Sequence, residues 1–519
     1  MMSFSAPFIC SCIGTMAVVG LIRWYYSVTT RLQGIPGPPL RSTIVGNLEE
    51  LSRAPMGTKM NVWARKYGQT YKIRGALMEP WLILGDPRGA GYVLQGKNYV
   101  RPESDRLFLE LFFGKSLFCA EGDEYRKMRK YLNPAFTLQS VQDVSHILFE
   151  LADNLKRQWD ETLDGREVAV FDIAPKIHML SLDAISMTMF MHNLSASKGK
   201  IPALLHQMSN SPAGDFWTIL LETFASLFPY ILYLPSPIKK YAHTLRTEFG
   251  NIAQEVWAGK DGGGMHAKVL DALGKAQSSD GPVSKDEAIA QITSILFAGS
   301  ETTANVITES LYELSRNLSI QHKLRTEIFN FRSVHERPPG FEDLMNPTTF
   351  PYLDAVIRES LRTKAVLREI GRMALHDDVI PLQFPIYGST RREVHVKAGQ
   401  IIQIPIRDGI NADESIWGPD VDEFRPERWI EPDGLPSSVD FIHAQGRTLS
   451  FGDGPKACLG RIFALAEIKI VVSTIISQFS LENSGAILDF YHLGGNTVKP
   501  VIRGREAEGV QLPVQVRTL

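Results

Sequence analysis

The sequence predicts a mainly α-helical protein with minor β-sheets, preceded by one N-terminal membrane-spanning helix. Apolar residues recur at helical spacing in six stretches, whereas only three short runs alternate as strands do. Strand and helix patterns do not alternate along the chain, so a doubly wound sheet is not expected. A length of 519 residues with 44% hydrophobic residues is sufficient for a large core, and we expect one continuous body.

The N-terminal helix is predicted from the uncharged run Phe4 to Ile22. At 1.5 Å per residue it would be about 28 Å long, roughly the thickness of the hydrocarbon core of a bilayer. The run is long for the apolar part of a signal peptide, and it lacks a basic start and a small-residue cleavage site. Aromatic and basic residues follow it, which is typical of a membrane interface and predicts a cytosolic body. We therefore expect residues 1–33 to be an uncleaved, single-pass membrane anchor.

Residues 34–40 contain the run Ile35-Pro36-Gly37-Pro38-Pro39, which stops any helix and stiffens the chain. The segment fits a generic linker and equally a hinge that sets the orientation of the body on the membrane. Residues 41–519 would then form the body. The helical stretches are 141–161, 174–192, 237–258, 284–317, 351–364 and 458–479, the strand-like runs are 70–74, 81–85 and 393–404, and surface loops are predicted at Gly259–Gly264 and Gln277–Pro282.

Composition excludes several classes of function. The formal net charge is −2, which gives no electrostatic footprint for nucleic acid, and no nucleic-acid partner is expected. The four cysteines form no C-x-x-C pair, so neither a disulfide framework nor a zinc ribbon is predicted. The twelve histidines include no H-E-x-x-H motif, and the chain contains no G-x-S-x-G elbow or P-loop.

The most specific chemistry lies in the segment Phe451–Gly460, of sequence FGDGPKACLG. Gly452, Gly454 and Pro455 predict a tight loop with close backbone approach. A strongly helical segment begins just after Cys458, and a helix N-terminus favours a thiolate. The sulfur could be a nucleophile or a metal ligand, whereas a lone cysteine elsewhere is usually an inert core residue.

This segment resembles the haem-binding signature F-x-x-G-x-[R/K]-x-C-x-G of the cytochrome P-450 monooxygenases. The resemblance implies that Cys458 is the axial thiolate ligand of haem b iron and that Phe451 packs beside the sulfur. It also implies that Gly452 contributes to the cofactor site. The family usually has arginine, paired with a haem propionate, where this chain has Lys456, which keeps the charge and loses the bidentate fork.

Three further motifs match the family in order and spacing, so the resemblance covers nearly the whole chain. Glu359 and Arg362 match its E-x-x-R motif, and i, i+3 spacing on a helix brings them to one face. The resemblance adds Arg428, from the segment Phe424–Trp429, as the third member of a structural network, with Trp429 in place of the usual phenylalanine. It assigns Arg372 to a haem propionate.

The segment Ala298–Thr303 (AGSETT) lies within the helix predicted over residues 284–317, which Ser284 and Glu287 would start as a capping box. Alone, it fits a contact between small residues of packed helices. The resemblance implies instead a widened helix groove over the haem, where Thr302 would hold the hydrogen-bond network of the oxygen and Glu301 would relay protons.

A fourth segment, Tyr125–Arg129, resembles the W-x-x-x-R helix of the same family. Tyr125 stands in place of the usual tryptophan. The resemblance implies that Arg129 contacts a haem propionate.

The resemblance implies an O2-dependent monooxygenase of the eukaryotic microsomal type, held in endoplasmic reticulum lipid. It is similar to members of fungal secondary metabolism, which often act on terpenoids. Electrons would come from NADPH through a separate cytochrome reductase, because the chain has no flavin or nicotinamide motif. Two alternatives remain open: a haem-thiolate isomerase or dehydratase acting on a peroxide, and a hydrolase with Cys458 as nucleophile.

Overall fold

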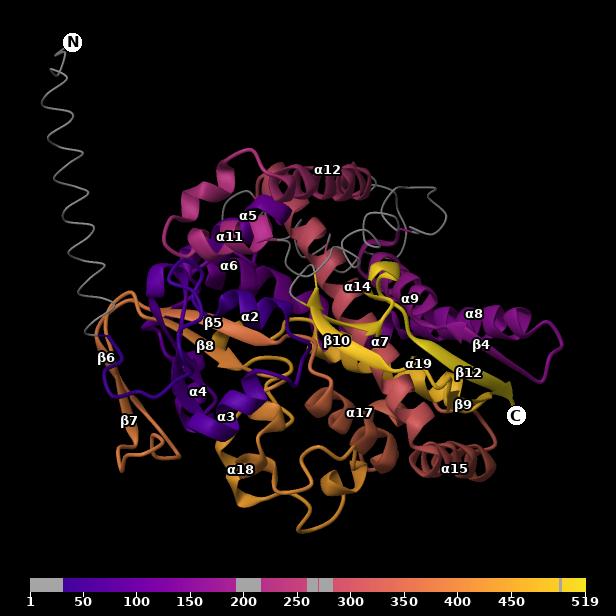
Figure 1. The fold of residues 1–519 in the computed structure, drawn as a ribbon. Coiled ribbons are helices and arrows are strands. Elements are labelled where there is room, and N and C mark those ends of the chain that lie inside the picture. The colour runs from indigo at the N-terminus through magenta and orange to yellow at the C-terminus, as the bar shows by residue number, and fades with distance from the viewer. Residues whose placement is uncertain (1–30, 193–215, 259–268, 270–282, 494–496) are drawn as a thin grey trace, which may run out of the picture.

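The computed structural model describes residues 31–192, 216–258, 269, 283–493 and 497–519. Helices form most of the molecule, and the strands form small sheets that lie at its left and right sides and near its centre in Figure 1. The helices are α2 (Leu48–Arg53), α3 (Met60–Tyr67), α4 (Pro87–Gln95), α5 (Glu103–Phe113), α6 (Gly122–Leu132), α7 (Leu138–Asp143), α8 (Ser145–Leu163), α9 (Ala174–Phe190), α11 (Phe216–Ala225), α12 (Pro237–Ala258), α14 (Lys285–Arg316), α15 (Leu318–His335), α16 (Phe341–Met345), α17 (Pro351–Thr363), α18 (Glu414–Trp417) and α19 (Arg461–Ile476).

The strands are β1 (Thr70–Arg74), β2 (Pro80–Leu84), β3 (Tyr99–Val100), β4 (Val168–Asp172), β5 (Glu369–Ala374), β6 (Asp378–Pro381), β7 (Glu393–Val396), β8 (Ile401–Pro405), β9 (Phe479–Asn483), β10 (Leu488–Leu493), β11 (Thr497–Ile502) and β12 (Pro513–Thr518). Among the described residues they form four sheets, with the orders β1-β2-β8-β5-β3, β4-β12-β9, β10-β11 and β6-β7. The prediction of a mainly α body with minor β-sheets is confirmed.

The register of the five-stranded sheet determines which side chains share a face. Tyr71 pairs with Ile83, Ile83 with Gln403, and Gln403 with Gly371, so these four residues form one row across β1, β2, β8 and β5. Directly paired residues point to the same side of a sheet. Helices α2 and α3 cover the β1–β2 end of this face with apolar side chains.

Helix α14 runs through the middle of the molecule (Figure 1) and packs against α9, α12 and α19 in the largest apolar cluster. Its 32 residues correspond to a length of about 48 Å. Ser284 caps its start, because its Oγ accepts a hydrogen bond of 3.1 Å from the Glu287 N–H. In a complete capping box the Glu287 carboxylate would accept a hydrogen bond from the Ser284 N–H. Here it accepts a hydrogen bond of 2.7 Å from the Tyr131 hydroxyl instead.

Two predicted elements are each divided in the structure. The predicted strand 393–404 is two strands, because Gly399, with φ +79°, turns the chain between β7 and β8. Strand β7 then pairs with β6, whereas β8 joins the five-stranded sheet. The predicted helix 141–161 breaks at Val144 between α7 and α8, where the Ser145 hydroxyl donates to the Gln142 carbonyl.

The start of the described chain lies against the five-stranded sheet. The Pro36 carbonyl accepts a hydrogen bond of 2.8 Å from the Lys72 N–H of β1. Leu32 and Ile35 are buried, and the Lys72 ammonium donates to the Leu32 carbonyl. Residues 32–36 are therefore held along the sheet, and the folded body includes Leu32, which precedes the predicted boundary at residue 33.

Across the ranges that the structure describes, no helix combines the length and the apolar character needed to cross a bilayer. The predicted anchor falls almost entirely on residues 1–30, which are outside those ranges. The two predicted loops, Gly259–Gly264 and Gln277–Pro282, are outside them as well.

A buried carboxyl group lies between α9 and α19. Glu467 is fully buried, and its Oε1 accepts a hydrogen bond of 2.5 Å from the Ser181 hydroxyl. Its Oε2 has no hydrogen-bond partner among the described residues. Burial raises the pKa of Glu467 to about 8, although the Ser181 hydrogen bond opposes this. Glu467 is therefore protonated in the folded protein at neutral pH.

This raised pKa predicts that stability declines with increasing pH. The ordinary glutamate pKa is 4.5, so between about pH 4.5 and pH 8 the unfolded chain binds fewer protons than the folded protein. The contribution of Glu467 to the unfolding free energy is fully present below pH 4.5 and is lost as pH rises toward 8. Glu467→Gln should remove this dependence, on the order of 1 kcal/mol per pH unit, in urea unfolding at pH 5 and pH 8. The exposed control Glu161→Gln should retain the pH dependence of the unfolding free energy. If Glu467→Gln retained it as well, Glu467 would be ionised in the folded protein.

Candidate functional site

The loop Phe451–Gly460 lies between the end of α4 and the start of α19. The Cys458 N–H donates a hydrogen bond of 2.8 Å to the Phe451 carbonyl and closes the loop. Gly452 and Gly454 adopt φ values of +69° and +68°, which favour glycine. A Cβ on Gly454 would lie 2.4 Å from the Leu94 carbonyl oxygen of α4, so glycine permits this close approach. The tight loop predicted from the sequence is present.

Cys458 is enclosed by protein, yet its side chain is accessible and therefore faces an interior space. Burial raises the pKa of the Cys458 thiol, and the Gly460 N–H with the guanidinium groups of Arg129 and Arg461 opposes this rise. Coordination to a metal ion deprotonates a thiol outright. An enclosed and accessible sulfur suits a metal ligand better than an inert core cysteine, which would be packed on all sides.

Helix α14 contributes an accessible face at the predicted AGSETT segment. Ala298, Gly299 and Thr302 are partly exposed, whereas the residues on either side of them are buried. The Thr302 hydroxyl donates a hydrogen bond of 2.8 Å to the Ala298 carbonyl four residues earlier. A Cβ on Gly299 would lie 2.6 Å from the Ile185 side chain of α9, so this glycine allows the two helices to pack closely.

The three predicted propionate-binding cations come from α6, from the cysteine loop itself and from β5. The Arg129 guanidinium of α6 donates a hydrogen bond of 2.7 Å to the Ala457 carbonyl. Lys456 forms an ion pair with Glu121 and donates to the Ala120 carbonyl at 3.3 Å. Arg372 of β5 is 4% exposed and, within the described residues, donates only to the Gly371 carbonyl and forms no ion pair.

The electrostatics of these cations fit an anionic group. Burial and, to a smaller extent, the neighbouring Arg101 guanidinium lower the pKa of Arg372 to about 10, although Glu121 and Asp105 oppose this. Burial also lowers the pKa of Lys456 to about 8, although Glu121 opposes this. A buried guanidinium that forms no ion pair is costly, and a carboxylate in direct contact with it would reduce that cost. Haem carries carboxylate groups at one edge, so these cations and the accessible Cys458 together fit a haem.

The two residues of the predicted proton relay lie in different environments: Glu301 is buried, whereas Thr302 is partly exposed. Glu301 is buried and forms an ion pair with Lys499 of β11, and its Oε2 lies 3.5 Å from His178 Nδ1. Burial raises the pKa of Glu301, but the Lys499 ammonium and, to a smaller extent, His178 hold this pKa well below its usual range. The side chains of Glu301 and Thr302 are about 100° apart around the helix, and of the two only Thr302 is partly exposed. The sequence contained no signal for Lys499 or His178 as partners.

The structure brings the predicted structural network together. Glu359 accepts hydrogen bonds of 3.0 and 2.8 Å from the Arg362 guanidinium and one of 3.0 Å from Arg428. All three side chains are essentially unexposed. Trp429, which the sequence did not indicate as a member, joins the network: its indole N–H donates to Glu359 Oε2 at 3.0 Å. The phenylalanine usual at this position could not make that bond.

Comparisons with known proteins agree with this geometry. The cytochrome P450 family model matches residues 36–501. Cytochrome P450 monooxygenase claW of Ampulloclitocybe clavipes is 32% identical over 90% of this chain and 88% of its own, and cytochrome P450 monooxygenase 128 of Postia placenta is 31% identical over 94% and 93%. The ganoderic acid synthetase of Ganoderma lucidum is 26% identical over 90% and 91%.

The chain belongs to the cytochrome P450 family. It is a monooxygenase-type oxidoreductase similar to fungal members, and haem is its cofactor. The family uses O2, an organic substrate and electrons from a redox partner. The predicted family, enzyme class and cofactor are confirmed, and the roles of individual site residues stay predictions.

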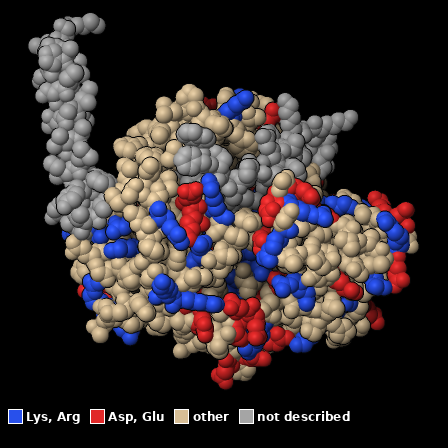
Figure 2. All heavy atoms as spheres, viewed as in Figure 1, with Lys and Arg blue, Asp and Glu red and all other residues tan. Residues whose placement is uncertain are grey.

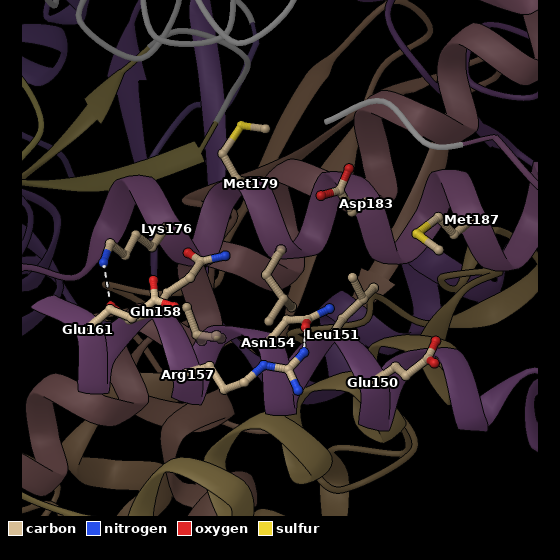
Figure 3. A pocket seen from close by; sticks show the side chains of 12 residues that line it. Glu150, Leu151, Asn154, Arg157, Gln158, Glu161, Lys176, Met179, Asp183 and Met187 are labelled. Carbon is tan, nitrogen blue, oxygen red and sulfur yellow. Dashed lines mark hydrogen bonds between the residues drawn. The ribbon is translucent and has the colours of Figure 1, made fainter. Parts of the chain in front are cut away.

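Two surface hollows lie apart from the predicted site residues. One, of about 390 Å³, is lined by residues of α8 and α9, among them Glu150, Asn154, Lys176 and Asp183 (Figure 3). The other, of about 640 Å³, lies beside α3 and α18. Neither contains Cys458, Thr302 or a cation of the cysteine loop. Acidic and basic side chains are interspersed on the face shown in Figure 2.

Proposed function

We propose that this protein is a membrane-anchored monooxygenase that inserts one oxygen atom from O2 into a small, largely apolar substrate, with electrons from NADPH through a separate cytochrome reductase. The observation that carries the proposal is the placement of an enclosed, accessible Cys458 near buried and partly buried cations, in a chain that belongs to the cytochrome P450 family. Turnover of candidate substrates with NADPH and a reductase in a heterologous host, followed by product analysis, tests it.

The roles of the residues follow from their chemistry. Haem bound through a thiolate supplies the activation of O2. Cys458 would bind the iron, with Phe451 and Gly452 shaping its loop, while Arg129, Arg372 and Lys456 would hold the haem carboxylates. Thr302 lies on the partly exposed face of α14, and its hydroxyl would donate and accept a proton during oxygen activation.

Aromatic side chains of α5 support an apolar substrate. Phe108 and Phe112 have ring centroids 4.7 Å apart, and Phe113 lies 4.8 Å from Phe297 of α14. Leu111 of α5 is a further, partly buried apolar side chain. Pockets lined in this way bind apolar ligands. The name of one relative, ganoderic acid synthetase, supports a terpenoid or another secondary metabolite as the substrate.

Thr302→Ala tests oxygen activation. We expect unchanged substrate binding and an unchanged CO-difference spectrum, with product per NADPH about tenfold lower and more peroxide released. The physical reason is that a positioned proton donor typically contributes 10² or more to such steps, and its loss diverts reduced oxygen to peroxide. The measurement is the ratio of product to NADPH consumed, together with peroxide formation.

The matched control is Ser300→Ala, two residues away on the same helix. The Ser300 hydroxyl is buried and donates to the Phe297 carbonyl at 3.2 Å, so it lies away from the partly exposed face of α14 that carries Thr302. Its removal should leave the coupling ratio unchanged. Wild-type coupling in Thr302→Ala would contradict the role of Thr302. Turnover of a peroxide substrate without NADPH would instead favour the isomerase or dehydratase alternative.

Exposed apolar side chains support attachment to membrane lipid beyond the anchor. Phe228, Tyr230 and Leu234, between α11 and α12, are each more than half exposed, as is Ile44 after the described N-terminal end. Helix α11 contacts α2, so the two regions are neighbours. Exposed apolar and aromatic residues of this kind suit the interface of a bilayer. We propose that this surface rests on the endoplasmic reticulum membrane with the body in the cytosol.

Deletion of residues 1–30 should release the protein from membranes in part while leaving haem incorporation intact. The deletion stops before Arg31 because the Arg31 guanidinium donates to the Ala398 carbonyl at 2.8 Å and Leu32 is buried. Membrane flotation and the CO-difference spectrum measure the two expectations. A truncated protein that cannot bind haem would show that residues 1–30 belong to the fold.

A further inference from the structure

Three polar side chains on one face of the five-stranded sheet, the face of the Tyr71–Gly371 row, each have an atom with no hydrogen-bond partner among the described residues. Gln403 is 9% exposed and its Oε1 has no hydrogen-bond partner among the described residues. The same holds for the Tyr71 hydroxyl, 1% exposed, and for Glu369 Oε2. Unpartnered buried polar atoms are uncommon in native proteins, and each calls for water or a ligand. We call Tyr71, Glu369, Gln403 and Asp105 the sheet-face polar cluster.

Asp105 of α5 completes this cluster above Gly371. A Cβ on Gly371 would lie 2.9 Å from Asp105 Oδ2, 3.3 Å from Gln403 Oε1 and 3.6 Å from Gln403 Nε2. The carboxylate and the amide therefore meet over one residue that has no side chain. Asp105 is enclosed by protein yet partly accessible, and its only hydrogen bond among the described residues is from the Ser104 hydroxyl at 3.2 Å.

The cluster adjoins the aromatic side chains of α5. Arg372, the next residue of β5 after Gly371, points to the opposite face of the sheet, but it lies close enough to Asp105 to lower the pKa of that carboxyl group. Asp105 and Phe108, at i and i+3, share a face of α5, and Phe112 at i+7 continues it. This face therefore changes from polar at the sheet to aromatic toward Phe112. A ligand along it would have one polar end and one apolar end.

The unpartnered atoms determine the chemistry of the polar end. Gln403 Oε1 and Glu369 Oε2 are hydrogen-bond acceptors, and the carboxyl group of Asp105 adds further acceptor positions, while the Tyr71 hydroxyl can donate or accept. Most of these positions fit a group that donates hydrogen bonds. Arg101, Arg372 and Arg368 lie close to Asp105 and Glu369 and offset their charge, which favours a neutral donor over an ammonium. A hydroxyl group meets both conditions.

We propose that Asp105 and Gln403 bind a hydroxyl group of the substrate, so the enzyme takes an apolar skeleton that already carries an alcohol. The reaction that supplies the substrate is therefore an earlier hydroxylation, or a cyclisation or hydrolysis that leaves an alcohol. The inference rests on the proposed monooxygenase function and names its substrate class. Asp105 and Gln403 are specificity-determining residues and take no part in oxygen activation.

Titration of the holoenzyme with matched alcohols and hydrocarbons tests the proposal. The pairs are farnesol with farnesene and geraniol with myrcene, and binding is followed by the substrate-induced optical difference spectrum. We expect the wild-type protein to bind each alcohol about tenfold more tightly than its hydrocarbon, as one hydrogen bond to a charged group allows. Asp105→Ala and Gln403→Leu should each reduce this preference, and the double variant should abolish it. Hydrocarbon affinity should change less than about twofold.

A control variant separates polarity from packing. Phe108→Ala should weaken the alcohol and the hydrocarbon of each pair alike, because it removes apolar contact area from the same helix face. The CO-difference spectrum of every variant reports an intact haem site. Absence of an alcohol preference in the wild-type protein, including absence of binding, would overturn the proposal, as would a preference that survives the double variant. Failure of the proposed function is distinct, since it would appear as a missing thiolate spectrum or missing NADPH-dependent turnover.

Discussion

Replacement of Cys458 by serine is expected to abolish the thiolate-type CO-difference spectrum and all haem-dependent turnover. A serine hydroxyl stays protonated at neutral pH and is a poor ligand for iron, whereas a coordinated cysteine is a thiolate. Haem would lose its one covalent attachment to the protein, although the cations around Arg372 would remain. The measurements are the reduced CO-bound spectrum and the haem content of the purified variant.

Cys119→Ser is the matched control, since Cys119 is the other cysteine that the structure describes. It is buried in a turn, where its sulfur lies 3.3 Å from the Ser116 carbonyl oxygen. A serine hydroxyl can replace that contact, and the CO spectrum should be unchanged. A Cys458→Ser protein that kept the thiolate spectrum would show that Cys458 is not the ligand. A wild-type protein with no such spectrum would return the cysteine-nucleophile alternative to consideration.

Glu359→Gln is expected to destabilise the folded protein by about 3–5 kcal/mol, because it removes the one carboxylate between two buried guanidinium groups. Glu359 accepts from Arg362, Arg428, the Arg425 N–H and the Trp429 indole. A glutamine would turn an N–H₂ group toward these donors. The midpoint of thermal unfolding and the fraction of protein that retains haem measure the loss.

The control for this prediction is Asp123→Asn. Asp123 and Arg126 have the same i, i+3 spacing on α6, but their side chains are 94% and 67% exposed. An exposed pair contributes little to stability, so the unfolding midpoint should not move.

Trp429→Phe removes a single hydrogen bond from Glu359 and should lower the free energy of unfolding by about 1 kcal/mol. Equal effects of Glu359→Gln and Asp123→Asn would contradict the assigned burial of the network.

Local pattern was sufficient to predict the long helices. The spans 237–258, 284–317 and 351–364 agree with α12, α14 and α17 within a residue at each end. Their apolar periodicity and caps lie within the element itself, so no distant contact is needed to recognise them. The cysteine loop was predictable for the same reason, since Gly452, Gly454 and the following helix are contiguous with Cys458.

Elements whose form depends on distant partners were predicted less well. Residues 393–404 alternate like one strand, and only the pairing of β7 with β6 and of β8 with β2 and β5 divides them. The sequence of residues 34–40 predicts a linker or hinge and gives no sign of contact with the body. The hydrogen bond of this segment to Lys72 and the burial of Ile35 become visible only once β1 is placed beside it.

The sequence by itself determined the helical class, the loop that presents Cys458 and the pairing of Glu359 with Arg362, because each depends on residues within a few turns of one another. Only the tertiary structure brought Lys499 to Glu301, Trp429 to Glu359, and Asp105 to Gln403 over Gly371. These contacts join residues 70 to almost 300 positions apart. A buried charge or polar group must find a partner, but the sequence does not specify which distant side chain the fold will place within hydrogen-bonding distance.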